Sequence, residues 1–238
     1  MFLHHHEAHL FFQPHLPWHE QHATLNPRLL QWIAAEQPAG KCLLDVGCGS
    51  GRLTLAVAPL AAVVVGIDRD RHALALGQAQ ARAAGLTHVY FVAADAETTP
   101  YAALLGGRPP DMVIAHLCMS PAILQRAHAA LPPGGCLVFA ALHRAQWQET
   151  GRPSRFAFEA EALHALLREG GWHCEAMELD SEVVHFARPE DLDLYFATSP
   201  LRQRWQQDGR WQRLVAHLAR GGECFTARSH LLVKARKC

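Results

Sequence analysis

The sequence predicts an α/β fold: a doubly wound, mostly parallel sheet of seven strands with a helical cover. Three observations indicate this fold. Short apolar runs alternate with helix-like runs, several helix-like runs stop at glycine, and half of the 238 residues are apolar, which is enough for one large domain with a sizeable core. Strands that alternate with helices pair in parallel, because each helix returns the chain to the end of the sheet at which the preceding strand began.

The elements of the first 142 residues follow in order. A helix over 26–37 begins with Asn26 as N-cap and Pro27 in its first position. Short apolar runs, one of them rich in valine, predict strands at 41–47, 63–68, 89–95, 111–117 and 136–142. The alanine- and leucine-rich runs between them predict helices at 52–61, 71–85 and 121–135.

The remainder of the chain departs from this alternation. It predicts a helix at 158–172, a strand at 174–187, two or three short helices between 189 and 222, and a closing strand at 226–237. These strands bring the sheet to seven. We expect a helical and aromatic cover segment over 1–40, and a domain over 41–238 with a helical insertion near 189–222.

Composition argues against several classes of protein. None of the seven cysteines is spaced as C-x-x-C, which is typical of reduced thiols in the cytoplasm rather than of a disulfide framework or a zinc site. The histidines of HHHEAH, residues 4–9, lack a matching Cys/His set that would define a metal geometry, so we predict no metal site. The longest apolar run, 53–67, is interrupted by Pro59 and is too short to span a bilayer. We therefore predict a cytoplasmic protein without a membrane segment.

The net charge of zero conceals an asymmetry. Residues 201–238 hold nine Lys and Arg against two Asp and Glu, whereas residues 1–200 hold thirteen against twenty. A basic segment of this kind is compatible with an anionic partner such as RNA. A solvated helix face followed by a strand is the commoner origin of such a pattern, and the sequence favours it without excluding the partner.

The stretch LLDVGCGSG, residues 43–51, is the most informative motif. Gly47, Gly49 and Gly51 directly follow an apolar strand that carries Asp45 near its end. Glycine permits the positive φ angles and close backbone approach that a sharp strand-to-helix turn needs. The N–H groups at the start of the next helix then face the carboxyl ends of the strands, where open α/β sheets bind ligands. We expect a nucleoside-type ligand there.

Spacing distinguishes between the kinds of nucleoside ligand. The dinucleotide pattern G-x-G-x-x-G would place its third glycine at Arg52 or at Thr54, and neither position is glycine. The phosphate-loop pattern needs a Lys-Ser or Lys-Thr pair, which does not follow these glycines. The remaining pattern, D-x-G-x-G-x-G, combines an acid with a turn that has no phosphate-binding lysine. It favours a cationic nucleoside over a pyrophosphate.

Several motifs, in order, resemble those of the class I S-adenosylmethionine-dependent methyltransferases. They are LLDVGCGSG, VVVGIDRD with Asp68 at the end of the second strand, FVAADAE with Asp95 at the end of the third, PPDMVIAHLCMS and LPPGGCLVF. The resemblance covers residues 41–144 well and the rest of the chain loosely. It implies a Rossmann-like methyltransferase fold, S-adenosyl-L-methionine as cofactor, and methyl transfer by in-line displacement.

The same resemblance implies where the cofactor binds. Asp45 and the backbone of the glycine turn would hold its methionine end. Asp68, at the end of the second strand, would hold the ribose, and Asp95, at the end of the third, would contact the adenine. A carboxylate suits the ribose, because it accepts two O–H bonds from a vicinal diol. The residues implied to bind the cofactor are Asp45, Gly47, Gly49, Gly51, Asp68, Arg69, Asp95, Ala96 and His116.

Methyl transfer from a sulfonium depends on alignment and a dry pocket more than on a catalytic side chain. A general base is needed only where the acceptor is protonated. The candidate bases are His116 and His143, which follow the fourth and fifth strands, with a structural histidine as the competing interpretation. The candidate substrate-binding residues, in the N-terminal segment and the loop TGRPSRF, are Trp18, His19, His22 and Arg155.

The predicted acceptor is a small molecule. The stretch after the fourth strand, AHLCMS, lacks the NPPY-type tetrapeptide that marks methylation of amino groups in this family, and no RNA-binding appendage is recognisable. Two alternatives stay open. One is an RNA or protein acceptor docked by the basic C-terminal segment, and the other is a non-catalytic subunit that binds S-adenosylmethionine. The oligomeric state is not predicted.

Overall fold

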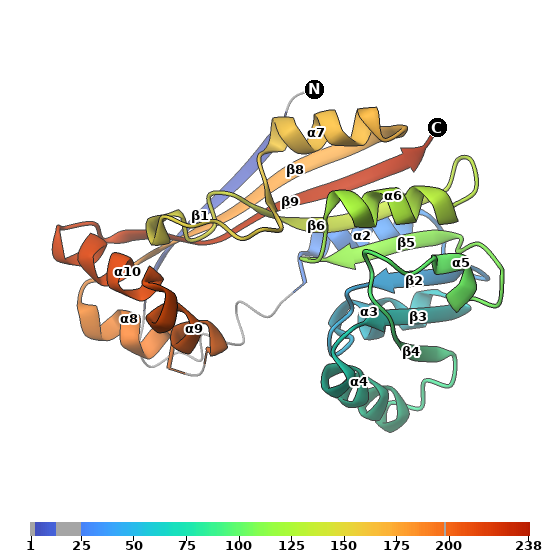
Figure 1. Ribbon diagram of the computed structural model, residues 1–238, viewed down its shortest axis with the longest axis horizontal. Helices are drawn as coiled ribbons and strands as arrows, with labels where there is room; N and C mark the ends of the chain where they lie inside the picture. The colour runs from blue at the N-terminus through green and yellow to red at the C-terminus, as the bar shows by residue number, and fades with distance from the viewer. Residues whose placement is uncertain (1–2, 13–24, 198) are drawn as a thin grey trace. The chain divides into compact units, whose positions relative to one another are not determined.

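The computed structural model describes residues 3–12, 25–197 and 199–238, which contain one sheet of nine strands (Figure 1). The strands are β1 (His4–Phe11), β2 (Cys42–Val46), β3 (Val63–Asp68), β4 (Val89–Ala93), β5 (Met112–His116), β6 (Cys136–His143), β7 (Ala157–Phe158), β8 (Trp172–His185) and β9 (Cys224–Lys237). They pair in the order β1-β8-β9-β6-β5-β2-β3-β4, and β7 pairs with β6. The helices are α2 (Pro27–Ala35), α3 (Arg52–Val57), α4 (Arg71–Ala83), α5 (Tyr101–Leu104), α6 (Pro121–Ala130), α7 (Ala160–Glu169), α8 (Pro189–Tyr195), α9 (Pro200–Asp208) and α10 (Arg210–Ala219).

Strands β2 to β6 form the parallel array that the alternation with helices predicts. Leu43 of β2 lies opposite Val64 of β3 on one side and Met112 of β5 on the other. Four of the five residues of β2 are buried, because helices cover both faces of this central strand. A continuous apolar run is therefore what its position requires, and the predicted α/β fold class is confirmed.

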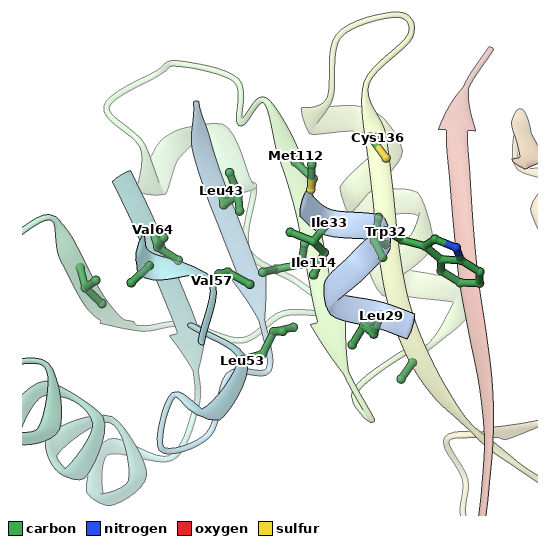
Figure 2. Close-up of a cluster of buried hydrophobic side chains, with 14 of the residues drawn as sticks. Leu29, Trp32, Ile33, Leu43, Leu53, Val57, Val64, Met112, Ile114 and Cys136 are labelled. Carbon is green, nitrogen blue, oxygen red and sulfur yellow. The ribbon is translucent and has the colours of Figure 1, made fainter. Parts of the chain in front are cut away.

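Helix α2 shows how a helix covers the sheet. It begins where predicted, since the side chain of Asn26 accepts a hydrogen bond from the N–H of Arg28 (2.8 Å). Leu29 and Ile33 of α2 are fully buried and join Leu53 of α3 in one hydrophobic cluster against the strands (Figure 2). Figure 1 draws α6 on the opposite face of β5 and β6, so the sheet is wound on both sides.

The last strand of the chain, β9, runs antiparallel to both of its neighbours, β6 and β8, whereas β8 is parallel to its other neighbour, β1. The N–H of Gly134, just before β6, donates to the carbonyl oxygen of Lys237 at the end of β9 (3.0 Å). The N–H of Cys238 donates to the carbonyl oxygen of Gly171, just before β8 (3.0 Å), and the N–H of Phe186, just after β8, donates to that of Glu223, just before β9 (3.0 Å). The end of β9 thus pairs with the starts of both β6 and β8.

The chain divides into two compact units. One holds Leu25–Ala141, Phe158–Met177 and Leu232–Cys238, and the other holds Leu142–Ala157 and Glu178–Leu231 together with the described part of the N-terminal segment. The predicted division at residue 40 coincides with no boundary between these units. The second unit has its own core, in which aromatic side chains from β9, from the segments that follow β6 and β8, and from the region of α8 to α10 meet. Its buried aromatic members are Trp147, Phe186, Phe196, Trp205 and Phe225.

Two strands were not expected from the sequence. Residues His4–Phe11 form β1, parallel to β8, in the segment for which we predicted a helical cover. The run HHHEAHLF lacks apolar–polar alternation, and almost all of it is exposed, so nothing local marks it as a strand. With the two-residue β7, β1 raises the number of strands from the predicted seven to nine.

Candidate functional site

The turn after β2 needs glycine at two positions for steric reasons. A Cβ atom on Gly47 would lie 2.2 Å from Sγ of Cys118, and one on Gly51 would lie 2.5 Å from the ring of Phe91. All three glycines of the turn have positive φ angles, as the motif predicts: 69° at Gly47, 55° at Gly49 and 85° at Gly51. The turn therefore brings bare backbone to the carboxyl ends of the parallel strands.

Asp45 is completely buried near the end of β2. The hydroxyl of Thr54, in α3, donates to Oδ2 of Asp45 (2.6 Å), while Oδ1 has no hydrogen-bond partner among the described residues. Burial raises the pKa of Asp45 to about 7, against the lowering effect of hydrogen bonds from the side chain and the backbone of Thr54, and the nearby charge of Asp68 raises it further. A buried carboxylate oxygen without a donor is costly, and a cationic ligand would relieve that cost. The residues present thus fit a cationic nucleoside.

Asp68 ends β3, and the glycine turn holds it in place. The N–H of Gly49 donates to Oδ2 of Asp68 (2.8 Å), and the N–H of Asp70 donates to Oδ1 (2.9 Å). The N–H of Gly47 donates to the carbonyl oxygen of Ile67 (2.8 Å), which ties the turn to the same strand. Each carboxylate oxygen of Asp68 can accept a further bond. The arrangement therefore suits the two hydroxyls of a vicinal diol.

Asp95 lies in the turn that follows β4. The carbonyl oxygen of Asp68 accepts a hydrogen bond from the N–H of Ala94 (3.0 Å), so the ends of β3 and β4 are joined. Oδ1 of Asp95 accepts from the N–H of Glu97 (2.8 Å), and the carbonyl oxygen of Ala96 accepts from the hydroxyl of Tyr101 (2.8 Å). These bonds give the loop a defined shape one strand further along the sheet from Asp68.

His116 is the last residue of β5 and is half-buried. Burial lowers the pKa of His116 to about 4, and the positive charge of Arg52 adds to the effect. The ring is therefore neutral at pH 7. Burial, with the charges of Asp68 and Asp45, raises the pKa of the nearby Cys118 thiol to about 11, so this thiol stays protonated.

Sequence reasoning missed several residues that complete this edge. The hydroxyl of Thr54 donates a hydrogen bond to the carboxylate of Asp45, and the charge of Arg52 lowers the pKa of His116. The side chain of Cys118 occupies the space into which a Cβ atom on Gly47 would project. Arg52 and Thr54 were considered only as positions where a third glycine was absent. Their place in the first turn of α3, directly after the glycines, is the signal that could have identified them.

The remaining predicted site residues have different surroundings, and three of them are outside the described part of the chain. His143 belongs to the second unit, where its Nδ1 contacts the hydroxyl of Ser229 (3.0 Å), which in turn contacts that of Ser181 (3.1 Å). The guanidinium of Arg155, in the same unit, lies 4.0 Å from the ring centre of Phe156. Arg69 lies near enough to Cys118 to lower the pKa of its thiol, in opposition to the acids. Trp18, His19 and His22 are outside the described residues.

Two kinds of feature are not found within the described ranges. No helix there is long and apolar enough to cross a membrane. In the same ranges, no group of three or more His, Cys, Asp or Glu side chains is placed to hold a metal ion.

Comparison with known proteins identifies the family. Residues 38–208 match the family model described as a methyltransferase domain. The chain belongs to the S-adenosylmethionine-dependent methyltransferases. A relative from Paraburkholderia phytofirmans, named ubiquinone biosynthesis O-methyltransferase, is 32% identical to this methyltransferase over 196 residues, which is 78% of each chain. The predicted family and methyltransferase activity are thereby confirmed.

Solved structures share the fold of this methyltransferase. The YcgJ protein from Bacillus subtilis superposes with a TM-score of 0.66 over 89% of this chain and 99% of its own, at 14% identity. Magnesium protoporphyrin IX methyltransferase (ChlM) from Synechocystis, in a structure with bound SAH, superposes with a TM-score of 0.59 over 93% and 84%, at 13% identity. S-adenosyl-L-methionine is the cofactor, as predicted, and the buried oxygen of Asp45 fits its positive charge.

Proposed function

We propose that this methyltransferase transfers the methyl group to an oxygen atom of a small molecule. Relatives that match 78% of its length, at 32% and 31% identity, are named O-methyltransferases. The observation that carries the proposal is the neutral imidazole of His116, which ends the strand adjacent to β2. A hydroxyl acceptor has a proton to lose, and a neutral imidazole can accept it.

The cofactor-binding roles belong to the same proposal. The unpartnered Oδ1 of Asp45 receives the cationic methionine end, beside the backbone of Gly47, Gly49 and Gly51. Asp68 accepts bonds from the two ribose hydroxyls with the lone pairs that its two backbone donors leave. Asp95 and Ala96 contact the adenine, with Arg69 beside it. The first two roles have the stronger support, because the carboxylates are already oriented by other bonds.

S-adenosylmethionine, when bound, supplies both the methyl group and its leaving group. The task of the protein is to align the acceptor oxygen with the methyl carbon and to exclude water. His116 accepts the hydroxyl proton late in the step, when the bond from oxygen to carbon has begun to form and the proton has become acidic. A base whose pKa is about 4 is too weak to remove it earlier. His143 remains the second candidate base, and Arg155, Trp18, His19 and His22 remain candidate substrate-binding residues.

A macromolecular acceptor is less well supported. Most basic residues of 201–238 already interact within the chain: Arg202 with Asp193, Arg210 with Asp208, Arg228 with Asp180 and Glu182, and Lys234 and Arg236 with Glu36 and Glu175. Charges that are paired within the protein displace fewer counterions from nucleic acid, so they contribute less to binding it. We also propose a cytoplasmic location, which the seven free cysteines support.

The experiment uses S-adenosylmethionine with a ¹³C-labelled methyl group. The purified enzyme is incubated with small hydroxyl, amine and thiol compounds, and the methyl carbon of the product is observed by NMR, since its chemical shift distinguishes O-, N- and S-methyl groups. We expect label on oxygen. Transfer only to nitrogen or sulfur would overturn the choice of acceptor atom and leave the family assignment intact.

A pair of histidine variants tests the base. We expect His116→Gln to lower kcat by roughly 10²- to 10⁴-fold, with little change in the KM for the cofactor, on the usual scale for general-base catalysis. The control is His72→Gln, at an exposed position of α4, which should leave kcat unchanged. Equal kcat values for the two variants would remove His116 as the base, and His143→Gln would then be the variant to measure.

A further inference from the structure

Four side chains of the second unit form a line of contacts that the methyl-transfer site does not use. Sγ of Cys224 on β9 lies 3.4 Å from Nδ1 of His185 on β8 and 4.0 Å from its Nε2. Nε2 of His185 lies 3.1 Å from Nδ1 of His9 on β1, and Nε2 of His9 lies 3.1 Å from Oε1 of Glu7. The strands β1, β8 and β9 that carry them lie side by side (Figure 1).

The carboxylate of Glu7, at the end of this line, determines which atom donates the proton in each hydrogen bond. An ionised Glu7 can only accept, so Nε2 of His9 carries a proton and donates it. Nδ1 of His9 is then an acceptor, and Nε2–H of His185 donates to it. Nδ1 of His185 is therefore left as an acceptor, and the sulfur of Cys224 lies 3.4 Å from it. The arrangement is that of a nucleophile, a base, and groups that orient the base.

The strand register explains why the line forms. Phe11 of β1 lies opposite His185 of β8, and His9 lies two residues earlier, so the side chains of His9 and Phe11 project from the same face of β1. The ring of Phe11 stacks on that of His185 at 4.7 Å between centroids, which restrains the imidazole. His5 is a further titratable neighbour, with its Nε2 3.8 Å from Oε2 of Glu7. Cys224 itself is exposed and open to reagents from solution.

We propose that Cys224 is an activated thiol and a site of modification by small disulfides. The thiol passes its proton to Nδ1 of His185, and the thiolate sulfur attacks one sulfur of the disulfide R–S–S–R. The S–S bond of the reagent breaks as the new bond from Cys224 to S–R forms. The departing thiolate takes the proton from Nδ1–H, so one thiol and one disulfide yield a mixed disulfide and one free thiol.

A metal site is the alternative that the residue types suggest. Its donors would have to converge on one point, whereas here each donor contacts the next along a line. Among the residues described, no group of three or more such side chains is placed to hold an ion. The geometry therefore favours proton transfer along the line.

The test compares two exposed cysteines of the same chain. Cys238 is exposed as well, but no imidazole lies within hydrogen-bond distance of its sulfur in the described part of the chain. Cys238→Ser leaves Cys224 to react, and Cys224→Ser leaves Cys238. Each variant is mixed with an aromatic disulfide that releases a coloured thiolate, at about pH 6.5, where roughly one ordinary thiol in a hundred is ionised. Mass spectrometry identifies the modified residue.

We expect Cys224 to react about 10-fold faster than Cys238 at this pH, and the difference to shrink as pH rises above about 8.5, where an ordinary thiol ionises unaided. His185→Gln should abolish the difference, and His9→Gln, which keeps His185, should reduce it. Equal rates for the two cysteines in the otherwise unaltered chain would overturn the proposal. Fast reaction of Cys224 that survives both histidine variants would also overturn it, and so would fast reaction that requires a chelator, because the thiol would then be a metal ligand.

Discussion

The two edges of the parallel sheet in the first unit use carboxylates in opposite ways. At the carboxyl ends of the strands, and counting the described residues alone, Asp45 has one oxygen without a donor and Asp68 accepts its hydrogen bonds from backbone N–H groups. At the amino ends, Glu36 contacts both Lys234 (2.6 Å) and Arg236 (2.8 Å).

The amino-end edge is a closed network of charges. Glu175 contacts the same two cations as Glu36, and Oδ2 of Asp111 accepts from the N–H of Cys42 (2.7 Å) at the start of β2. Every one of these acids has a partner from the chain, whereas the acids at the other edge keep acceptor capacity for something else. From this difference we infer that acids in one sheet serve stability where their partners are built in, and we propose that they serve binding where they are not. Five predictions test it.

The largest effect is expected at the glycine turn. Gly47→Ala should lower the free energy of unfolding by about 3 kcal/mol and abolish cofactor binding, because the new Cβ meets Cys118 and the φ angle is positive. Gly40→Ala is the matched control: it has φ 80° and open space around the Cβ, so it carries only the backbone cost of about 1–2 kcal/mol. Thermal unfolding and calorimetry measure both. Equal losses would mean that the contact with Cys118 is unimportant.

The next effect compares an acid from each edge. Asp68→Ala should weaken cofactor binding by about 1–3 kcal/mol, the usual scale for lost hydrogen bonds to a charged group. Asp111→Ala also removes an acceptor from a backbone N–H, but at the amino-end edge, so it should lower stability and leave affinity unchanged. Titration calorimetry with S-adenosylmethionine compares the two. Unchanged affinity in Asp68→Ala would contradict the assignment to the ribose.

Asp45 should make cofactor binding depend on pH. Its pKa, about 7 in the free protein, means that the carboxyl is mostly protonated below that pH and must lose a proton to meet a cation. Affinity should therefore be about 5- to 10-fold higher near pH 7.5 than near pH 6. Calorimetry in buffers with different ionisation enthalpies should detect proton release, and Asp45→Asn should remove the dependence.

Asp45 should affect the free protein in the opposite direction. Its folded-state pKa lies above the ordinary value of 3.8, so the unfolded chain loses the proton first as pH rises. The contribution of Asp45 to the free energy of unfolding is therefore present below about pH 4 and is lost as pH rises to about 7. A difference between wild type and Asp45→Asn that stays constant over this range would contradict the raised pKa.

The smallest effect is expected for the ion pairs. Burial raises the pKa of Glu36, but hydrogen bonds from Arg236 and Lys234 outweigh it and lower the pKa below 4.5. Its contribution to stability is thus present above about pH 4.5 and is lost on further acidification. Glu36→Gln should cost about 1 kcal/mol or less in chemical denaturation at neutral pH and leave cofactor affinity unchanged. A large loss of affinity would mean that the two edges are not separate in function.

Much of the first unit could be predicted from the sequence, because its signals are local. The strands β2 to β6 are short apolar runs bounded by turns, and Asn26 and the glycine stops mark helix ends. The acids of the candidate site lie at fixed places in motifs, so Asp45 and Asp68 could be named before any contact was known. The roles proposed for them come from the resemblance of those motifs to a family.

The second unit was less predictable, because its contacts join distant segments. The ring of Trp147 contacts those of Tyr195 and Phe225, which lie dozens of residues further along the chain. Strand β1 forms because β8 provides the strand with which it pairs. His143 looked like a second base from its position after a strand, and its contact with Ser229 became visible only in the folded chain.

The order of the elements, the glycine turn and the identity of the strand-end acids were determined by the sequence alone, since periodicity, turn chemistry and spacing act over a few residues. The tertiary structure alone decided which oxygen of Asp45 lacks a donor, that burial keeps His116 neutral, and that Cys224 lies beside an imidazole. Hydrogen bonding, burial and proton affinity depend on neighbours that are far away along the chain, and only folding brings those neighbours within range.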